Sequence, residues 1–551
     1  MKRCFTLLAL CIFFYQYSFA QFQHSYGLDS RESGYSVQMT QHDNGFIVAG
    51  TTSFPVIAGG DATLMKTDPA GNPLWQMAYG GERYEQFNSV RYIGNQGYGA
   101  LGHTNSFGFG NHDMYFVRTD FNGNPITSKI YGGEKDDRGH CIQRIKDPDI
   151  GEGFIMVGET QSFPHILPGK NVYVVLTDLL GNVKRAVVLG YKYDQIGYWI
   201  EQTRDGGYIL VGSSTLNCTG GNGQLNDIYV VRLKPDLSVM WDRYIGGELN
   251  DEAFCVKETP KGNFIITGYT QSFGVGSQGD AYLLSLDAAG NFQWMRTYGL
   301  ERVDIAKGLI IDQNSTGSWN YVVSGYTNSV GPNNAYMFKT DANGNLLWTN
   351  TYGIDNYDYS YELTRSKPGY VFTGSVSSYG AGSNDIYLVE TDLNGKSGTD
   401  CEIRMQQEVI RHQPCITKIT KFEYVKPELR VDSRYERTDF VVKDCPFGSH
   451  SSAKEAQDNN LNKLAELKSE ANGIRIYPNP SAHRLNLSYI SDFQNSKIRI
   501  IPITGQQVVL QTTLQNLNKA ELDISQLVKG LYILEITKTD GQVQKLKFLK
   551  E

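Results

Sequence analysis

The sequence has 551 residues, of which 40% are hydrophobic and 20% charged, and its formal net charge is −7. This composition is typical of a globular chain with two or more domains and excludes a disordered chain. The negative charge gives no basic surface for nucleic acid or for an anionic membrane, so neither is expected as a partner. The 35 tyrosines and 58 glycines indicate many short strands joined by tight turns.

Residues 1–20 have the features of a secretory signal peptide. Two basic residues at positions 2 and 3 precede an apolar run over residues 4–14, and small residues at positions 18 and 20 predict cleavage between Ala20 and Gln21. The apolar run is too short to span a bilayer, and no other stretch approaches about 18 apolar residues. The sequence therefore predicts export without a membrane span.

One pattern recurs seven times within residues 21–400. An apolar run ends in glycine and leads into threonine and serine, and successive copies are about 49 to 57 residues apart. These glycines are Gly50, Gly102, Gly158, Gly212, Gly268, Gly325 and Gly374. Units of this length are typical of four-stranded propeller blades, so the sequence predicts an all-β fold, a seven-bladed β-propeller.

Each unit contains four expected strands, which in the first copy are residues 35–40, 45–52, 62–67 and 74–79. The turn at residues 68–72 contains aspartate, glycine and asparagine, which suit a hairpin because glycine and asparagine accept positive φ. A calcium loop is the alternative, but its full ligand spacing is missing. Tryptophans recur at one position of the fourth strand and are expected to pack between blades: Trp75, Trp241, Trp294 and Trp348.

The two ends of the repeat region complement each other. The seventh unit lacks a fourth strand, whereas residues 22–27 have the pattern of that strand with its Tyr-Gly ending. An N-terminal strand that completes the last blade would close the ring and leave no sheet edge open there.

The repeat resembles propeller repeats of secreted Bacteroidota proteins. The order of Asp280-Ala281-Tyr282, Asp287, Gly290 and Trp294 is also similar to kelch blades. The double glycine follows the tryptophan, as in Tyr79-Gly80-Gly81, which departs from the kelch pattern. The resemblance supports the fold and transfers no function.

Three further segments are expected after the repeats: a cysteine-containing connector over residues 401–445, a polar linker over 446–472 and a β-sandwich over 473–551. Cys141 and Cys255 occupy the same repeat position and are expected to be buried thiols. A disulfide could form between any two of Cys401, Cys415 and Cys445, and the sequence does not select the pair.

The tail resembles the type A C-terminal sorting domain of the type IX secretion system. The motifs that carry the resemblance are Pro478, Asn479 and Pro480, then 523–525, then Gly530 to Leu534 with Tyr532, and the lysine-containing segment 541–550. The resemblance implies type IX secretion machinery as a partner, passage through the periplasm, removal of the domain, and release or retention at the outer-membrane surface. An ordinary immunoglobulin-like binding module is the alternative.

An acidic residue recurs in the connection that enters each blade. These residues are Glu32, Glu85, Asp137, Asp251, Asp304 and Asp358, with Gln195 in the fourth blade. We expect them to accept hydrogen bonds between blades, since a ligand site requires asymmetry; Ca²⁺ binding near the channel is the alternative. The same interpretation applies to a second position, at the start of the third strand: Asp61, Asp113, Asn171, Asp227, Asp280, Asn334 and Asp385.

No motif of a hydrolase, metalloprotease or phosphate loop occurs, so no catalytic residue or cofactor is predicted. His103, His112 and His140 fall in or near one blade and are expected to face solvent. We expect non-catalytic binding of an extracellular glycan or protein through loops on one face, with the longest loop, residues 216–226, giving specificity. The alternatives are a secreted polysaccharide hydrolase or lyase and a surface structural protein.

Overall fold

The computed structural model describes residues 21–399, except 28–30, 54–58, 164–168, 191–192, 216–224, 276–277, 355 and 382, together with segments of 402–550. The chain divides into two units, residues 1–450 and 451–551.

The described cysteines Cys141 and Cys255 are buried free thiols, as predicted. Cys415 is exposed and bonds to no cysteine that the structure describes, whereas Cys401 and Cys445 lie outside the described residues.

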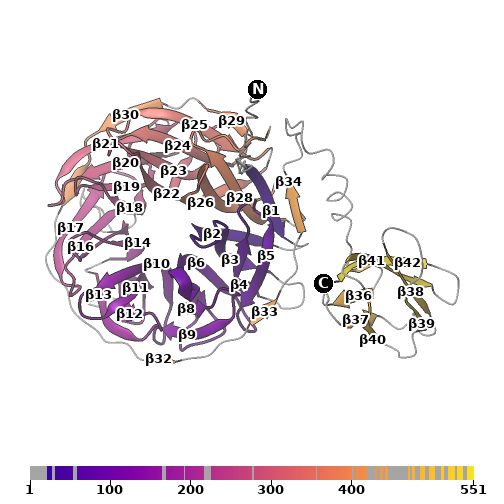
Figure 1. Ribbon diagram of the computed structural model, residues 1–551. Helices are drawn as coiled ribbons and strands as arrows, with labels where there is room; N and C mark the ends of the chain where they lie inside the picture. Colours follow the sequence, from indigo (N-terminus) through magenta and orange to yellow (C-terminus); the bar gives the residue numbers. More distant parts are fainter. Residues whose placement is uncertain are drawn as a thin grey trace, which may run out of the picture. The chain divides into compact units, whose positions relative to one another are not determined.

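The first unit contains seven antiparallel blades arranged in a ring, which confirms the predicted propeller (Figure 1). The innermost strands are β2 (Glu32–Met39), β6 (Glu85–Tyr92), β10 (Asp137–Asp147), β14 (Gln195–Gln202), β18 (Asp251–Glu258), β22 (Asp304–Gln313) and β26 (Asp358–Arg365). The second strands are β3 (Phe46–Thr52), β7 (Tyr98–Thr104), β11 (Gly151–Thr160), β15 (Tyr208–Ser214), β19 (Phe264–Thr270), β23 (Trp319–Thr327) and β27 (Gly369–Val376).

The third strands are β4 (Asp61–Thr67), β8 (Asp113–Thr119), β12 (Asn171–Asp178), β16 (Asp227–Leu233), β20 (Asp280–Leu286), β24 (Asn334–Asp341) and β28 (Asp385–Asp392). The fourth strands are β5 (Pro73–Tyr79), β9 (Pro125–Tyr131), β13 (Val183–Leu189), β17 (Val239–Gly246), β21 (Phe292–Gly299), β25 (Leu346–Tyr352) and, in the last blade, β1 (Phe22–Gly27). A short 3-10 helix, η1 (Gly94–Gln96), follows β6. The second and third strands of each blade are almost entirely buried, because both of their faces pack against neighbouring blades.

The N-terminal strand closes the ring as predicted. Strand β1 pairs antiparallel with β28, from Phe22 opposite Glu390 to Tyr26 opposite Ile386. The innermost strand of the first blade starts at Glu32, three residues before the expected start. The acidic residue therefore belongs to the strand and not to the connection that precedes it.

Adjacent blades are joined by a repeated tyrosine bond. A tyrosine at or next to the end of a fourth strand donates its hydroxyl to a glycine carbonyl in the turn that follows the next blade's third strand. The pairs are Tyr26 with Gly71, Tyr79 with Gly123, Tyr131 with Gly181, Tyr298 with Gly344 and Tyr352 with Gly395, at 2.6–2.7 Å. The tryptophans pack against the same turns, as predicted, and Trp75 and Trp241 donate to turn carbonyls at 3.1 Å.

The connector adds a fifth strand to six blades, which the sequence did not predict. We call residues 402–444 the strap. Its strands run backwards around the ring: β29 (Glu402–Arg404) on β25, β30 (Glu408–His412) on β21, β31 (Cys415–Thr417) on β17, β32 (Leu429–Arg430) on β9, β33 (Tyr435–Arg437) on β5 and β34 (Val441–Asp444) on β1. Residues 418–428, between β31 and β32, lie outside the described residues. The last strap strand therefore pairs with the strand that closes the ring.

The second unit has two four-stranded antiparallel sheets. One contains β35 (Glu470–Ala471), β36 (Ile474–Tyr477), β37 (Arg484–Tyr489) and β40 (Lys519–Asp523). The other contains β38 (Lys497–Pro502), β39 (Leu510–Thr513), β41 (Gly530–Thr537) and β42 (Val543–Lys550). Alternate residues of β38 and β41 are buried, which is typical of a sheet with one covered face.

The substitution Tyr298→Phe tests the bond between blades. Its hydroxyl is buried and donates to Gly344 at 2.7 Å, so removing it leaves a buried carbonyl without that donor. We expect the free energy of unfolding, measured in urea, to fall by about 1–2 kcal/mol. The matched control is Tyr357→Phe, whose side chain is exposed; equal losses in the two variants would contradict the interpretation.

The double substitution Val442→Pro with Lys443→Pro tests the strap. Alternate residues of an antiparallel strand donate to the partner, so one of two consecutive prolines must remove a bond between β34 and β1. We expect a lower melting temperature in differential scanning calorimetry than for the control pair Val442→Thr with Lys443→Thr. A melting temperature equal to that of the control would show that the last strap strand does not stabilise the closure.

Candidate binding site

The recurring acidic residues are the first residues of six innermost strands, and they lie apart, one at each of six blade junctions, with Gln195 at the seventh. Five of them accept hydrogen bonds from their own blade and from the preceding loop, and Glu32 accepts the Thr52 hydroxyl at 3.2 Å. Asp251 accepts the Ser272 hydroxyl at 2.6 Å and the Gly247 amide at 2.9 Å. Glu85 likewise accepts the Thr104 hydroxyl at 2.7 Å and the Gly81 amide at 2.9 Å. These bonds explain why threonine and serine follow the repeated glycine.

The second acidic position lies beside the first. A Cβ on Gly132 would lie 2.1 Å from Asp113 Oδ1 and 2.6 Å from Asp137 Oδ2, so only glycine fits between the two carboxyl groups. The same arrangement surrounds Gly80, Gly246 and Gly299. Among the described residues, no group of three or more histidine, cysteine, aspartate or glutamate side chains is placed to hold a metal ion.

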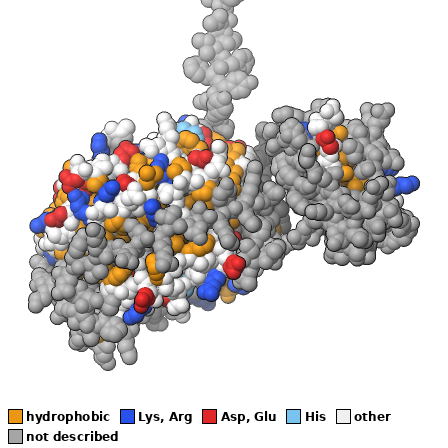
Figure 2. Space-filling model, turned by 90° about the horizontal axis from the view of Figure 1, so that it is seen from below, with side chains coloured by type: hydrophobic (Ala, Val, Ile, Leu, Met, Phe, Trp, Pro, Cys, Tyr) orange, Lys and Arg blue, Asp and Glu red, His pale blue; other side chains and the backbone are white. Residues whose placement is uncertain are grey.

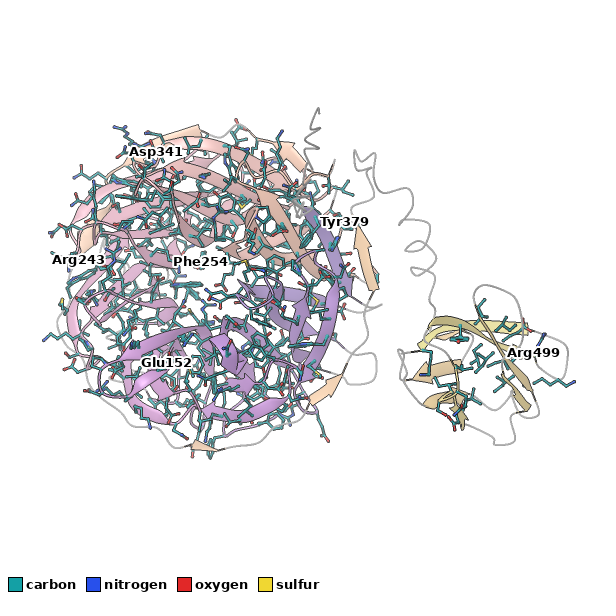
Figure 3. The ribbon with its side chains drawn as sticks, in the orientation of Figure 1. Glu152, Arg243, Phe254, Asp341, Tyr379 and Arg499 are labelled. Carbon is teal, nitrogen blue, oxygen red and sulfur yellow. The ribbon has the colours of Figure 1, made fainter. Side chains whose placement is uncertain are left out.

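A β-bulge shapes the wall of the channel. Each innermost strand shifts register against its neighbour at about its fourth residue, for example between Gly34 and Ser36. The fourth residues form one layer around the axis: Tyr35, Asn88, His140, Tyr198, Phe254, Lys307 and Tyr361. Figure 3 shows Phe254 beside the axis. Ring centroids in this layer are 5.2–5.4 Å apart for the pairs Tyr35–Tyr361, Tyr198–Phe254 and His140–Tyr198.

A charged layer lies further along the strands. Arg91 reaches Glu362 at 3.1 Å and Gln143 at 2.7 Å, and Lys257 reaches Glu201 at 2.7 Å. The buried Trp199 ring lies between the two cations, 5.3 Å from the Arg91 guanidinium carbon and 4.9 Å from the Lys257 nitrogen. Residues from five blades thus meet in this layer, which separates the two channel mouths.

We define the upper mouth as the end where the innermost strands begin and the lower mouth as the end where they finish. The predicted histidines gather at the upper mouth. His103 and His112 have ring centroids 5.5 Å apart, and His112 contacts Arg138 at 3.1 Å and Asp136 at 3.6 Å. The expectation that they face solvent is wrong for His103, which is buried, and for His140, whose Nε2 atom is buried. Burial lowers the pKa of His103 to about 3 and keeps its ring neutral.

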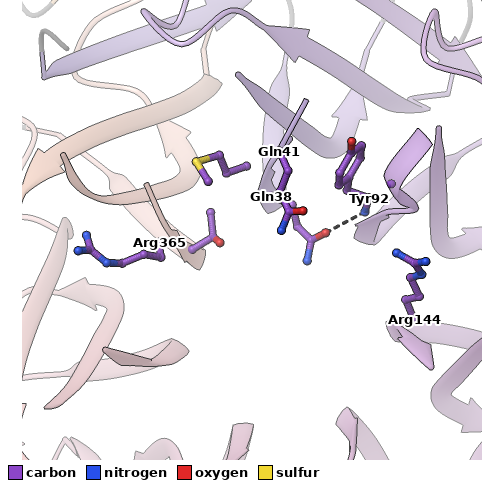
Figure 4. A pocket seen from close by; sticks show the side chains of 8 residues that line it. Gln38, Gln41, Tyr92, Arg144 and Arg365 are labelled. Atoms are coloured by element: carbon purple, nitrogen blue, oxygen red, sulfur yellow. Dashed lines mark hydrogen bonds between the residues drawn. The ribbon is translucent and has the colours of Figure 1, made fainter. Parts of the chain in front are cut away.

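A pocket of about 360 Å³ lies at the lower mouth (Figure 4). Strands and turns of blades one, two, three and seven contribute its lining: Gln38, Met39, Gln41, Tyr92, Gly94, Arg144, Thr364 and Arg365. Gln38 accepts the backbone amide of Tyr92 at 2.8 Å, which fixes one wall. The lining holds amides, a hydroxyl, a phenol and two guanidinium groups, and none of its side chains is a carboxylate.

Partners outside the lining hold the two arginines. Arg144 donates to Glu152 at 2.7 Å, and Arg365 pairs with Asp312 at 3.2 Å.

The Tyr92 ring stacks on His42 with centroids 5.7 Å apart and an interplanar angle of 22°, and Phe121 lies 4.7 Å from His42. An aromatic wall with fixed polar groups therefore borders the pocket. Sequence inspection missed this site, because its residues come from four separate repeats.

The tail motifs fall partly outside the described residues. Pro478, Asn479 and Pro480 are outside them, as is the signal peptide through Ala20, whereas Gln21 is described. Gly530 begins β41, and Tyr532 in that strand is buried. Residues 216–224 of the loop expected to give specificity also lie outside.

The tail is similar to a known family. Residues 475–551 match the secretion system C-terminal sorting domain. A comparison of the chain with curated proteins finds no match. The fold and the tail together define a propeller protein that is secreted or displayed at the cell surface. In the described residues, no helix is long and apolar enough to cross a membrane.

Two solved structures are similar at low identity. The extracellular domain of a putative hybrid two component system from B. thetaiotaomicron is 11% identical with a TM-score of 0.24, over 94% of this chain and 68% of that chain. Endo-1,5-alpha-L-arabinanase from Thermotoga petrophila RKU-1 is 13% identical with a TM-score of 0.25, over 67% and 99%. Neither likeness carries a functional conclusion.

The buried carboxyl groups predict a pH dependence of stability. Burial raises the pKa of Asp113 to about 6, against the opposing amides of Gly110 and Phe109, and raises that of Asp304 to about 6. An unfolded aspartate titrates near about 4, so the folded state binds more protons in between. This contribution to stability is complete below pH ~4 and is lost as the pH rises through about 6.

The substitution Asp113→Asn should reduce this dependence, because asparagine imitates the protonated carboxyl; Asn171 and Asn334 occupy the equivalent position in other blades. We expect the variant to melt at a higher temperature than the wild type at pH 7.5 and to show little difference at pH 4.5, measured by calorimetry. Glu82→Gln, at an exposed site, is the control. A variant less stable than the wild type at pH 7.5 would contradict the assignment.

Proposed function

We propose that the propeller is a non-catalytic extracellular binding module that takes a saccharide in the lower-mouth pocket. The observation that carries the proposal is the pocket lining, in which amides, a hydroxyl and guanidinium groups lie beside the Tyr92 ring. Its volume of about 360 Å³ falls in the range of small-ligand sites.

The chemistry of the lining suits sugar hydroxyls. The amides of Gln38 and Gln41 both donate and accept hydrogen bonds, as hydroxyl groups do. The guanidinium groups of Arg144 and Arg365 each pair with one carboxylate and keep further N–H donors for the oxygens of a sugar. The face of Tyr92 offers an apolar surface for a sugar ring.

The same lining favours binding over hydrolysis. Glycoside hydrolysis generally needs two carboxyl groups flanking the bond, and none of the lining side chains is a carboxyl. The nearby Glu152 and Asp312 are engaged by the pocket arginines. This supports binding without turnover as the function.

A glycan array with the chain from Gln21 to Glu551 tests the proposal. We expect specific saccharide signals that the double substitution Gln41→Ala with Tyr92→Ala lowers by about tenfold or more in affinity, through lost hydrogen bonds and ring contact. Gln293→Ala, exposed on an outer strand, is the matched control. Cleaved products in chromatography of the bound glycan, or full binding by the double variant, would contradict the proposal.

A further inference from the structure

Lys307 is the cation of the fourth-residue layer, and it has no oxygen partner among the residues that the structure describes. Its Nζ atom lies 3.2 Å from the centroid of the Phe254 ring. No hydrogen bond or ion pair joins this nitrogen to any residue that the structure describes. An ammonium group has three N–H donors, so all three are available to a ligand in the channel.

Other cations near the channel are neutralised. Arg91 pairs with Glu362, Lys257 with Glu201, and Arg138 and Lys170 with Glu159, at 2.7–3.7 Å. Lys307 therefore differs from the cations around it, although all of them come from the same repeated scaffold.

The groups that face Lys307 are mostly aromatic. Phe254 and Tyr198 lie on one side, with His140 beyond them, and Tyr35 and Tyr361 belong to the same layer. The charged group that opposes it is Glu252 of β18, whose Oε1 already accepts the Asn226 amide at 2.8 Å. Burial lowers the pKa of Lys307 to about 8, and Glu252 acts in the opposite direction.

A cation–π contact alone accounts for only part of this arrangement. Such a contact contributes about 0.5–2 kcal/mol, and the half-buried Lys307 side chain leaves the three donors of its ammonium group open to solvent or to a ligand. An anionic oxygen from a ligand would supply the missing acceptor. A ligand with a single negative charge suits the single positive charge of Lys307. A dianion would bring its second negative charge towards Glu252.

We infer that Lys307 binds the carboxylate of a small anionic ligand that enters through the upper mouth, with the apolar part of the ligand on the Phe254 and Tyr198 rings. This site is separate from the lower-mouth pocket, since the layer of Arg91, Trp199 and Lys257 lies between them. It does not depend on the proposed saccharide binding.

The probe is 4-fluorobenzoate, a ring with one carboxylate, observed by fluorine NMR with the mature full chain at pH 7. We expect saturable binding that Lys307→Met weakens by about tenfold or more, that Lys307→Arg keeps within about threefold, and that Lys184→Met, on an outer strand, leaves unchanged. The neutral match, 4-fluorobenzamide, should bind about tenfold more weakly than the carboxylate.

Raising the pH from 7 to 9 should weaken binding to the wild type as the amine loses its proton, whereas the Lys307→Arg variant should keep its affinity. Melting curves for each variant separate a folding defect from lost binding. Wild-type protein that fails to bind the probe at about 10 mM, or Lys307→Met that binds it as the wild type does, would overturn the inference. The double variant of the lower-mouth pocket should bind the probe normally.

Discussion

The pairing of β1 with β28 is the constraint on which the rest of the molecule depends. Five residues, from Phe22 to Tyr26, complete the last blade and convert seven sheets into a closed ring. Closure brings β26 beside β2 and so fixes the circle of innermost strands. Only then do fourth residues from different blades meet around one axis, and only then do Arg91 and Glu362, from the second and last blades, form an ion pair. The mouths and the layers between them follow from this one strand pair.

Within that ring, hydrogen bonds that repeat from blade to blade form the scaffold, whereas residues that differ from blade to blade form the candidate sites. Tyrosine bonds and carboxylate bonds recur at most junctions and resemble one another closely. The fourth residue varies freely because the bulge turns it into the channel and away from the blade contacts. Lys307 and Phe254 are consequences of this freedom. Figure 2 shows the propeller from the side, with charged side chains of both signs scattered among hydrophobic ones on its described residues.

The sequence predicts most of the scaffold and little of the sites, for a physical reason. The repeated glycine, turn residues such as Asp68 and Gly71, and the detached strand at residues 22–27 are local signals, so the blade count and the closure follow from them. The glycine that leads into threonine and serine and the acidic positions are visible in the sequence as separate patterns, but the hydrogen bonds between them are not. The meeting of Arg91 with Trp199 depends on the ring's curvature, which no local pattern encodes. The strap was missed because its strands are only two to five residues long.

The strap covers outer strand edges of the propeller before the chain continues to the tail. Four-stranded blades expose the outer edge of each fourth strand, and open edges promote pairing with other chains. Strap strands occupy six of these edges in reverse order and finish on β1. The strand that closes the ring therefore has a neighbour on both sides only when residues 441–444 are in place. Since the sorting domain begins at residue 475, after these residues, none of its described strands takes part in the closure or covers these edges. The propeller thus includes its strap as a structural part.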